Sequence, residues 1–217
     1  MNNVIDPLLP AVYVIDDDEA VLNAMEGLFL SVKMQVRTFS SATDFFAANL
    51  PVKHCCGCIV TDMRMPGMSG LDLLQKVKKQ ALNLPVIFVS GHANVEDSVR
   101  AMKEGAFDFF QKPFNEQKLL HRVGKATSMC IKQCKFEKDR EKLLGCYHDL
   151  SERECEVLEQ LVGGAPNKAI ARNLDISAKT VEFHRANIMK KFDANSLADL
   201  ILKAVAADPS LSPLVEK

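Results

Sequence analysis

Residues 58–62 read Cys-Ile-Val-Thr-Asp, a short apolar run that ends in a carboxylate. Three more runs are followed by a polar or charged residue: Val12–Ile15 by Asp16 and Asp17, Val86–Val89 by Ser90, and Phe109–Gln111 by Lys112. Stretches with helical spacing separate the runs. Alternating strands and helices predict a parallel α/β sheet, in which groups that follow the strands meet at the carboxyl edge.

The residues expected at that edge suit a magnesium ion and a phosphoryl group. Mg²⁺ takes oxygen ligands, which Asp16, Asp17 and Asp62 can supply. A phosphoryl group on Asp62 could be neutralised by the cation, the Ser90 hydroxyl and the Lys112 ammonium. Each feature alone is commonly a solvated turn or loop. Their combination in one order on one sheet favours a site that accepts a phosphoryl group.

Residues 1–125 resemble the receiver domain of two-component response regulators, and the FixJ-type subgroup in particular. The matching segments are Val14-Ile-Asp-Asp-Asp18, Val60-Thr-Asp-Met-Arg-Met-Pro-Gly-Met-Ser-Gly70, Val89-Ser-Gly-His92, Ala101-Met-Lys-Glu-Gly-Ala-Phe-Asp-Phe109 and Lys112-Pro-Phe114. The resemblance implies an α/β flavodoxin-like receiver with five parallel strands in the order 2-1-3-4-5. It also implies a sensor histidine kinase as the partner that donates the phosphoryl group.

The same resemblance implies a role for each acidic residue of the site. Asp62 is the expected phospho-acceptor. Asp16, Asp17 and Asp62 are expected to bind the cofactor Mg²⁺, with Asp17 and Asp62 as direct ligands. The backbone carbonyl of Arg64 is expected to complete the protein's share of the coordination.

A switch is implied by the resemblance as well. Ser90, Phe109 and Lys112 are the expected switch residues, with Ser90 and Phe109 in place of the family's usual Thr and Tyr. An acyl phosphate would draw in Ser90, and the Phe109 ring would fill the vacated space. The Lys112–Pro113 bond is expected to be cis. The face expected to dimerise in the phosphorylated state includes Val95, Val99, Met102, Lys103 and Phe110.

Composition limits the class of protein. The chain has 217 residues, which suits two small domains, with 47% hydrophobic and 25% charged residues. No run approaches the roughly 20 apolar residues of a membrane helix, and the N-terminus lacks the pattern of a signal peptide. A cytoplasmic protein with no membrane partner is expected. The formal net charge is −1, so nucleic-acid binding must depend on a local basic patch.

Four segments are expected along the chain. They are a receiver domain at 1–125, a helical linker at 126–148, a DNA-binding domain at 149–207 and a C-terminal tail at 208–217. The linker is rich in Lys and Glu, which favours a solvated helical spacer. A short coiled-coil contact is the alternative, although its apolar residues are too irregular for clean heptads.

The segment after the linker has the pattern of an all-α, four-helix helix-turn-helix domain. Ser151 and Glu154 form a capping box, Asn167 is expected to cap a short helix, and Ser177 is expected to cap the recognition helix. The segment resembles the LuxR/NarL-type DNA-binding domain. The matching residues are Leu150-Ser-Glu-Arg-Glu154, Pro166-Asn-Lys168, Ile170-Ala171 and Ser177-Ala-Lys-Thr-Val-Glu-Phe-His-Arg185.

The recognition helix has a predicted inner and a predicted outer face. Val181, Ile188 and Phe192 recur at spacings of seven and four, so they are expected to pack inward. The outer face is expected to present Glu182, Phe183, Ala186, Asn187 and Lys190. Asn187 could read adenine and Glu182 could accept a hydrogen bond from cytosine. The residues expected to meet phosphates are Lys168, Lys179, Thr180, Arg185, Lys190 and Lys191.

These features together predict a phosphorylation-switched transcription regulator. Residues 168–191 carry six Lys or Arg against two acids, a local net charge of +4. The expected partners are a sensor histidine kinase, double-stranded promoter DNA, RNA polymerase and a second copy of the chain. The expected protein is not an enzyme, apart from slow self-dephosphorylation.

Two alternatives belong to other classes. Aspartate-nucleophile phosphatases of the haloacid-dehalogenase type also use an Asp at a strand end, but they need a second Asp two residues later, where this chain has Arg64. A transcription regulator modulated by redox or metal chemistry could act through Cys55, Cys56 and Cys58, three of the seven cysteines. Cys130 and Cys134 also share a helical face.

Overall fold

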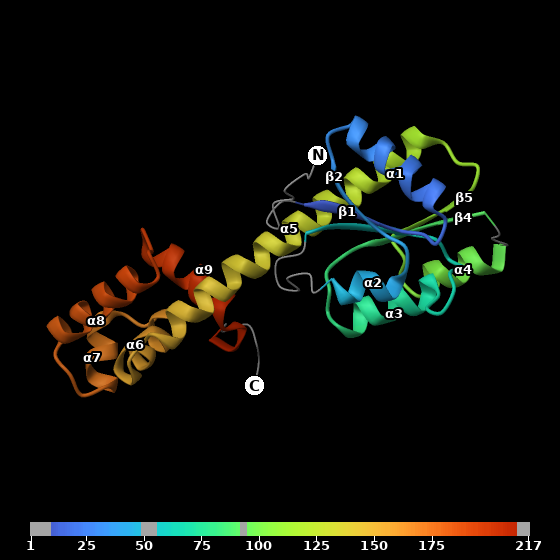
Figure 1. The fold of residues 1–217 in the computed structure, drawn as a ribbon. Coiled ribbons are helices and arrows are strands. Elements are labelled where there is room, and N and C mark those ends of the chain that lie inside the picture. Colours follow the sequence, from blue (N-terminus) through green and yellow to red (C-terminus); the bar gives the residue numbers. More distant parts are fainter. Residues whose placement is uncertain (1–9, 49–55, 92–94, 212–217) are drawn as a thin grey trace. The chain divides into compact units, whose positions relative to one another are not determined.

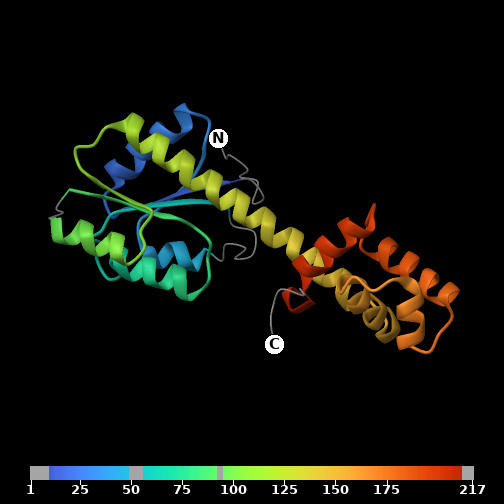
Figure 2. The same cartoon turned by 180° about the vertical axis from the view of Figure 1, so that it is seen from behind.

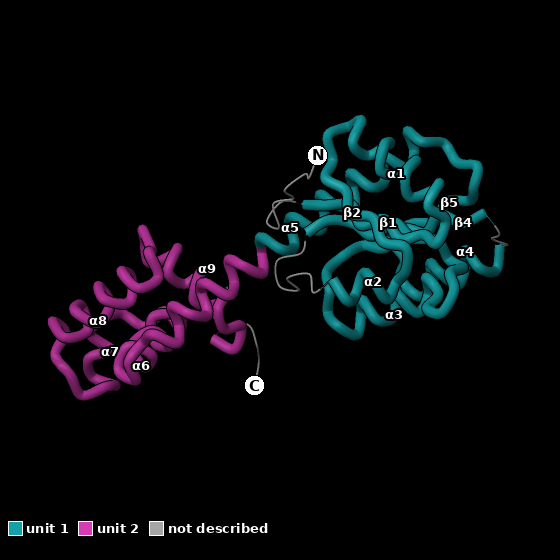
Figure 3. Tube along the Cα trace, in the orientation of Figure 1, with its two compact units in different colours: residues 1–135 teal, residues 136–217 magenta. Residues whose placement is uncertain are grey.

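The computed structural model describes residues 10–48, 56–91 and 95–211. Two compact units divide the chain, residues 1–135 and residues 136–217 (Figure 3). Cys55, one of the three cysteines of the alternative hypothesis, lies outside the described residues. None of the helices in the described ranges is long and apolar enough to cross a membrane.

The first unit is built on a five-stranded parallel sheet in the order β2-β1-β3-β4-β5 (Figure 1). The strands are β1 (Ala11–Ile15), β2 (Gln35–Phe39), β3 (Gly57–Thr61), β4 (Val86–Ser90) and β5 (Asp108–Gln111). The predicted strand order is confirmed. Ser90 is the last residue of β4 rather than the first residue after it, because it pairs with Gln111 of β5.

Helices cover both faces of this sheet, as Figures 1 and 2 show. The helices of the first unit are α1 (Glu19–Ser31), α2 (Ala42–Ala47), α3 (Gly70–Lys79), α4 (Val95–Lys103) and the start of α5 (Glu116–His148). Helices α1 and α5 pack on one face through buried residues such as Phe29 and Leu119. Helices α2, α3 and α4 pack on the other through Phe45, Leu73 and Ala101.

Side-chain caps begin several of these helices. The Ser41 side chain accepts a hydrogen bond from the Asp44 amide at the start of α2. Ser69 and Asp72 form a complete capping box at the start of α3. Helix α5 has no break near residue 125. It runs for 33 residues, so the stretch expected as a linker is one continuous helix with the last receiver helix.

The second unit packs four further helices around one core. They are α6 (Glu152–Val162), α7 (Asn167–Asn173), α8 (Ala178–Lys191) and α9 (Leu197–Ala207), followed by a single 3-10 turn, η1 (Pro209–Leu211). Val181, Ile188 and Phe192 of the α8 segment are buried in this core, as their spacing predicts. The core is completed by residues such as Leu158 and Leu200.

The helix ends of the second unit follow the sequence with one exception. Ser151 and Glu154 form the predicted capping box of α6, and the Ser177 side chain caps α8. The expectation that Asn167 caps α7 is wrong. Pro166 occupies the cap position and Asn167 is already helical; proline suits the start of a helix because it lacks the N–H that would go unpaired there.

Candidate functional site

The carboxyl ends of the strands bring the predicted phosphoryl-site residues to one edge of the sheet. Backbone bonds fix each position: the Asp62 amide donates to the Ile15 carbonyl at 3.0 Å, and the Lys112 amide donates to the Ser90 carbonyl at 2.9 Å. The Asp16 amide donates to the next strand at 3.2 Å. The functional side chains therefore start from backbone that the sheet holds in place.

An ion pair joins the first and last of these strand ends. The Lys112 Nζ lies 2.9 Å from the Asp16 Oδ2, and the other carboxylate oxygen of Asp16 accepts the Asp18 amide at 3.0 Å. Asp16 is only 5% exposed, whereas Asp17 is exposed. Both oxygens of the buried Asp16 carboxylate thus have a hydrogen-bonding partner, whereas Asp17 is exposed to solvent.

One oxygen of Asp62 tests whether this edge fits a cation or a phosphoryl group. The Oδ1 atom of Asp62 is buried and has no hydrogen-bond partner. A buried carboxylate oxygen without a partner carries a desolvation cost that a cation or a covalent phosphoryl group would relieve. Counting Asp16, Asp17, Asp62 and Lys112, the edge holds three carboxylates and one ammonium, so the donor set fits a hard divalent cation such as Mg²⁺.

Tight packing behind Asp62 limits how this loop can move. A Cβ added to Gly70, the first residue of α3, would lie 2.3 Å from the Asp62 carbonyl oxygen and 2.7 Å from the Phe88 ring. Only glycine fits that contact. Arg64 directs its side chain outward, where its guanidinium pairs with Asp97 of α4 at 3.2 Å.

Two of the three predicted switch residues, Ser90 and Phe109, lie on adjacent strands. Ser90 is 1% exposed at the end of β4. Phe109 of β5 is half-buried, and its ring centroid lies 6.3 Å from that of Phe88. The Lys112–Pro113 bond that follows is cis, as expected.

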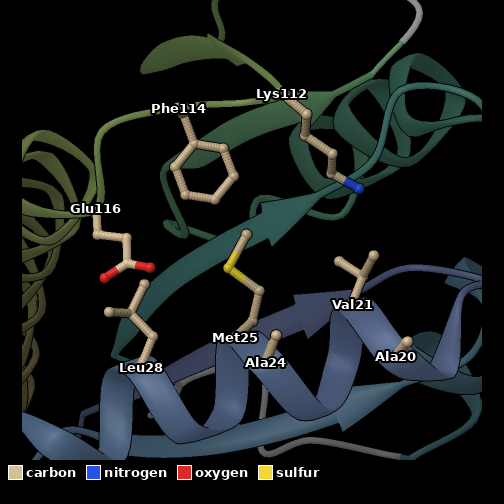
Figure 4. A pocket seen from close by; sticks show the side chains of 8 residues that line it. All are labelled: Ala20, Val21, Ala24, Met25, Leu28, Lys112, Phe114 and Glu116. Carbon is tan, nitrogen blue, oxygen red and sulfur yellow. The ribbon is translucent and has the colours of Figure 1, made fainter.

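An apolar pocket of about 300 Å³ borders Lys112 between α1 and the segment after β5 (Figure 4). Its wall on α1 is one helical face with Val21, Ala24 and Leu28, and the opposite wall carries Phe114. In the close-up, the Phe114 ring and the Met25 side chain point toward each other across the space. Sequence reasoning missed this pocket, because only the fold places the post-β5 segment over α1.

In the second unit the outer face of α8 is exposed as the helical spacing predicts. The exposed members of the predicted DNA-contact set are Lys168, Lys179, Glu182, Phe183, Ala186, Lys190 and Lys191, and Thr180, Arg185 and Asn187 are half-buried. Phe183 exposes 62% of its surface despite its apolar ring. The Thr180 hydroxyl is hydrogen-bonded to that of Ser177 at 2.8 Å.

Lys191 differs from the other basic residues of this set. Its ammonium lies 2.7 Å from the Glu154 carboxylate and also donates to the Asp149 carbonyl at 2.8 Å. Burial raises the pKa of Glu154, but hydrogen bonds from Lys191 and Ser151 together with the lysine charge outweigh it and hold that pKa below its usual value. This pair joins the end of α8 to the start of α6.

The cysteines do not group as the sequence suggested. Cys58 is fully buried among Val12, Val60 and the other residues between the sheet and α5, where burial raises the pKa of its thiol. Cys56 instead lies with Cys130 and Cys134 of α5, and the three sulfurs are all within 4.8 Å of one another. The expected trio of Cys55, Cys56 and Cys58 is therefore not the described cluster.

Comparison with known families defines the class of protein. Residues 12–124 match the response regulator receiver domain, and residues 148–204 match the bacterial regulatory proteins of the luxR family. The chain belongs to the two-component response regulators that join a receiver domain to a LuxR-type DNA-binding domain. Such proteins are transcription factors, not enzymes; the receiver implies a histidine kinase partner and typically binds Mg²⁺, and the helix-turn-helix implies DNA binding.

Individual relatives extend over nearly the whole chain. Response regulator protein TmoT of Ectopseudomonas mendocina is 43% identical over 190 residues, which is 88% of this chain and 86% of TmoT. FixJ of Azorhizobium caulinodans is 42% identical over 196 residues, 90% of this chain and 92% of FixJ. The solved structure of the response regulator StyR matches with a TM-score of 0.82 at 36% identity, covering 89% of this chain and 97% of StyR.

Proposed function

We propose that a sensor histidine kinase phosphorylates Asp62 and that this modification controls DNA binding by the second unit. The buried, unpartnered Oδ1 of Asp62 beside the Asp16–Lys112 pair is the observation that carries the proposal. An oxygen with no partner in the unmodified protein gains one when a cation or a phosphoryl group arrives.

The residues of this edge would contribute to holding the phosphoryl group in two ways, by binding Mg²⁺ and by contacting the phosphoryl oxygens directly. Asp16, Asp17 and Asp62, with the Arg64 carbonyl, would hold Mg²⁺, which supplies positive charge against the phosphoryl oxygens when bound. Lys112 exchanges its Asp16 partner for a phosphoryl oxygen. This exchange is favourable because the phosphoryl group carries more negative charge than the Asp16 carboxylate with which it competes for Lys112.

The switch follows from the same geometry. The Ser90 hydroxyl donates to a phosphoryl oxygen, and the half-buried Phe109 ring moves inward behind it. This biases a two-state equilibrium on the α4–β5 face toward a form that pairs with a second copy. The exposed apolar side chains on that face support the assignment: Val95 is 78% exposed, and Val99 and Met102 are each exposed by almost half. Lys103 is the last residue of α4. Phe110 of β5 packs on the α1–α5 side of the sheet, near Phe114, so its place on the dimerising face is the less direct one.

A dimer presents two copies of α8 to a two-fold-related DNA site. We assign base contacts to Glu182, Phe183, Ala186 and Asn187, the outward residues of the first three turns of α8. The phosphate contacts are assigned to Lys168, Lys179, Thr180, Arg185 and Lys190. Lys191 is left with a supporting role, because its ammonium is already paired with Glu154. RNA polymerase is the partner that a promoter-bound dimer would recruit.

We assign the kinase to the pocket beside Lys112. The kinase must bring a phosphohistidine to Asp62, so its docking surface has to border the acceptor edge. The pocket meets this requirement, since Lys112 lines it and also belongs to the phosphoryl site. Its apolar wall of Val21, Ala24 and Leu28 suits the apolar face of a partner helix.

Labelling with a small phosphodonor tests the acceptor directly. Wild-type protein incubated with acetyl phosphate and Mg²⁺ should gain one acid-stable, base-labile phosphoryl group, and Asp62→Asn should gain none. Asp18→Asn is the matched control, because it lies at the same edge and an Asn retains the cap on the Ala20 amide. Equal labelling of Asp62→Asn and wild type would contradict the proposal.

A further inference from the structure

Three thiols meet at the amino edge of the receiver sheet, at the end of β3 opposite Asp62. Cys56 directly precedes β3, and Cys130 and Cys134 lie one turn apart on α5. All three sulfurs are within 4.8 Å of one another, and the Sγ atoms of Cys130 and Cys134 are 3.9 Å apart. The chain brings them together across more than seventy residues, so the cluster is a product of the tertiary fold.

The separation of the Cys130 and Cys134 sulfurs matches that of two ligands sharing one metal ion, and Cys56 lies close enough to be the third. With a metal–sulfur bond of about 2.3 Å, two sulfurs are about 3.8 Å apart in tetrahedral and about 4.0 Å apart in trigonal coordination. The observed 3.9 Å separation of Cys130 and Cys134 falls between these values. A disulfide would require about 2.05 Å. Thiolates select soft or borderline cations such as Cu⁺ and Zn²⁺ over Mg²⁺.

The surrounding backbone holds the cluster in place. The Cys56 carbonyl accepts the Ala11 amide at 3.1 Å, and β3 packs so closely on β1 that a Cβ on Gly57 would lie 1.9 Å from the Ala11 oxygen. The Gly57 amide donates to the Cys130 sulfur at 3.2 Å. Such N–H donors to sulfur orient a ligand and stabilise its thiolate form.

A metal ion could reach the cluster from solvent and replace the thiol protons. Cys130 and Cys134 are buried, whereas Cys56 is half-buried and opens the cluster to solvent. Without a metal, Cys130 donates its S–H to the Asn83 carbonyl at 3.1 Å. Coordination would release this proton, together with those of the other two thiols, to solvent. The S–H hydrogen bond of Cys130 that is lost is weak beside the metal–sulfur bonds gained.

We propose that Cys56, Cys130 and Cys134 bind one thiophilic closed-shell ion, Zn²⁺ or Cu⁺, and that this ion ties α5 to the start of β3. Three thiolates complete a trigonal Cu⁺ site and leave one position open on Zn²⁺. The site lies in the last turns of α5 that belong to the first unit, and the same helix continues into the second. The bound ion would stiffen the receiver end of that connecting helix. This proposal does not depend on phosphorylation of Asp62.

The test measures metal binding to the full-length reduced protein. Zn²⁺ and, without oxygen, Cu⁺ are titrated separately in competition with a chelator of known affinity, and Co²⁺ serves as a probe whose sulfur charge-transfer bands report thiolate ligands. Wild type should bind one ion per chain. Each of Cys56→Ser, Cys130→Ser and Cys134→Ser should lose at least about 100-fold in affinity. Cys146→Ser, on the same helix but outside the cluster, should bind as wild type.

A second measurement uses only the wild-type protein, because Ser in place of the buried thiols could impair folding. One equivalent of the bound ion should slow alkylation of Cys56 several-fold and leave that of Cys146 and Cys155 unchanged. Absence of binding, unchanged affinity in Cys130→Ser, or equal alkylation of Cys56 with and without the ion would overturn the proposal. The ratio of the two wild-type affinities shows which of the ions the site selects.

Discussion

The ammonium of Lys112 lies 2.9 Å from the Asp16 carboxylate, a contact between residues 96 positions apart in the chain. It pairs the lysine at the proposed phosphoryl-acceptor edge with the carboxylate that is almost fully buried. The ion pair therefore competes with any cation that Asp16 would help to hold. It also keeps Lys112 at the edge before a phosphoryl group arrives.

Neutralising Lys112 should separate metal binding from switching. In Lys112→Met the edge loses the positive charge that repels a bound cation. Mg²⁺ should therefore bind about tenfold more tightly, a gain of about 1.4 kcal/mol. Phosphorylation of Asp62 should then fail to produce dimers. Calorimetric Mg²⁺ titration and light scattering measure the two effects, with the exposed Lys118→Met as control. Weaker Mg²⁺ binding in Lys112→Met would show that the lysine serves chiefly to position Asp16.

Dimerisation through the α4–β5 face can be tested with a matched pair of valines. Val99 on α4 is 46% exposed, and Val32 at the end of α1 is 45% exposed. With the phosphoryl mimic beryllofluoride and Mg²⁺, wild type should be dimeric and the unmodified protein mainly monomeric by light scattering at micromolar concentration. Val99→Asp should stay monomeric because it buries a charge in the interface. Val32→Asp should dimerise normally; dimers of Val99→Asp as stable as wild type would refute this face.

Kinase docking at the apolar pocket predicts a difference between two phosphodonors. Ala24→Asp places a charge in the pocket wall and should slow phosphotransfer from the partner kinase by about tenfold, equivalent to 1.4 kcal/mol. Labelling by acetyl phosphate should not change, because the acceptor edge is intact. Asn23→Asp, exposed on the same helix but not lining the pocket, is the control. If both donors slowed equally in Ala24→Asp, the defect would lie in the site and not in docking.

The proposed base contacts and the proposed phosphate contacts of α8 should respond differently to truncation. Asn187→Ala should cost about 1–3 kcal/mol at one base pair of the cognate site and leave binding to scrambled DNA unchanged. Lys190→Ala should weaken binding to both DNAs and reduce the salt slope by about one phosphate contact. Affinities for the two DNAs at several salt concentrations distinguish these outcomes. A uniform loss in Asn187→Ala would mean that α8 is oriented differently in the groove.

The ion pair between Glu154 and Lys191 predicts a pH-dependent stability for the second unit. The folded-state pKa of Glu154 is lowered, so its contribution is present above the unfolded value of about 4.3 and is lost as the pH falls through the folded pKa. Glu154→Gln should reduce the free energy of unfolding by about 1–2 kcal/mol at pH 7. The difference from wild type should shrink below pH 4. Urea unfolding across pH 3–7 measures this, with the exposed Glu152→Gln as control; a deficit independent of pH would rule out the ion pair as its cause.

Most of the fold was predictable because the signals are local. A strand of five residues followed by Asp62, or a Ser69–Asp72 capping box, depends on neighbours a few positions away. The same holds for Val181, Ile188 and Phe192, whose spacing alone predicts that they face inward. The edge that would collect Asp16, Ser90 and Lys112 follows from the rule that parallel strands share a carboxyl end.

The sequence by itself determined which side chains end each strand and which face of each helix is apolar, because strand and helix periods are properties of short segments. Only the tertiary structure decided which partner each polar side chain meets. Asp16 pairs with Lys112, Lys191 pairs with Glu154, and Cys56 meets Cys130 rather than Cys58. Cys56 and Cys58 are two residues apart, so a continuous strand would place them on the same face of the sheet. Cys56 precedes β3, and Gly57 between them has a φ of 149° that only glycine adopts readily, so Cys58 belongs to a different layer of the core. Helix α5 brings in thiols that no local pattern connects to β3.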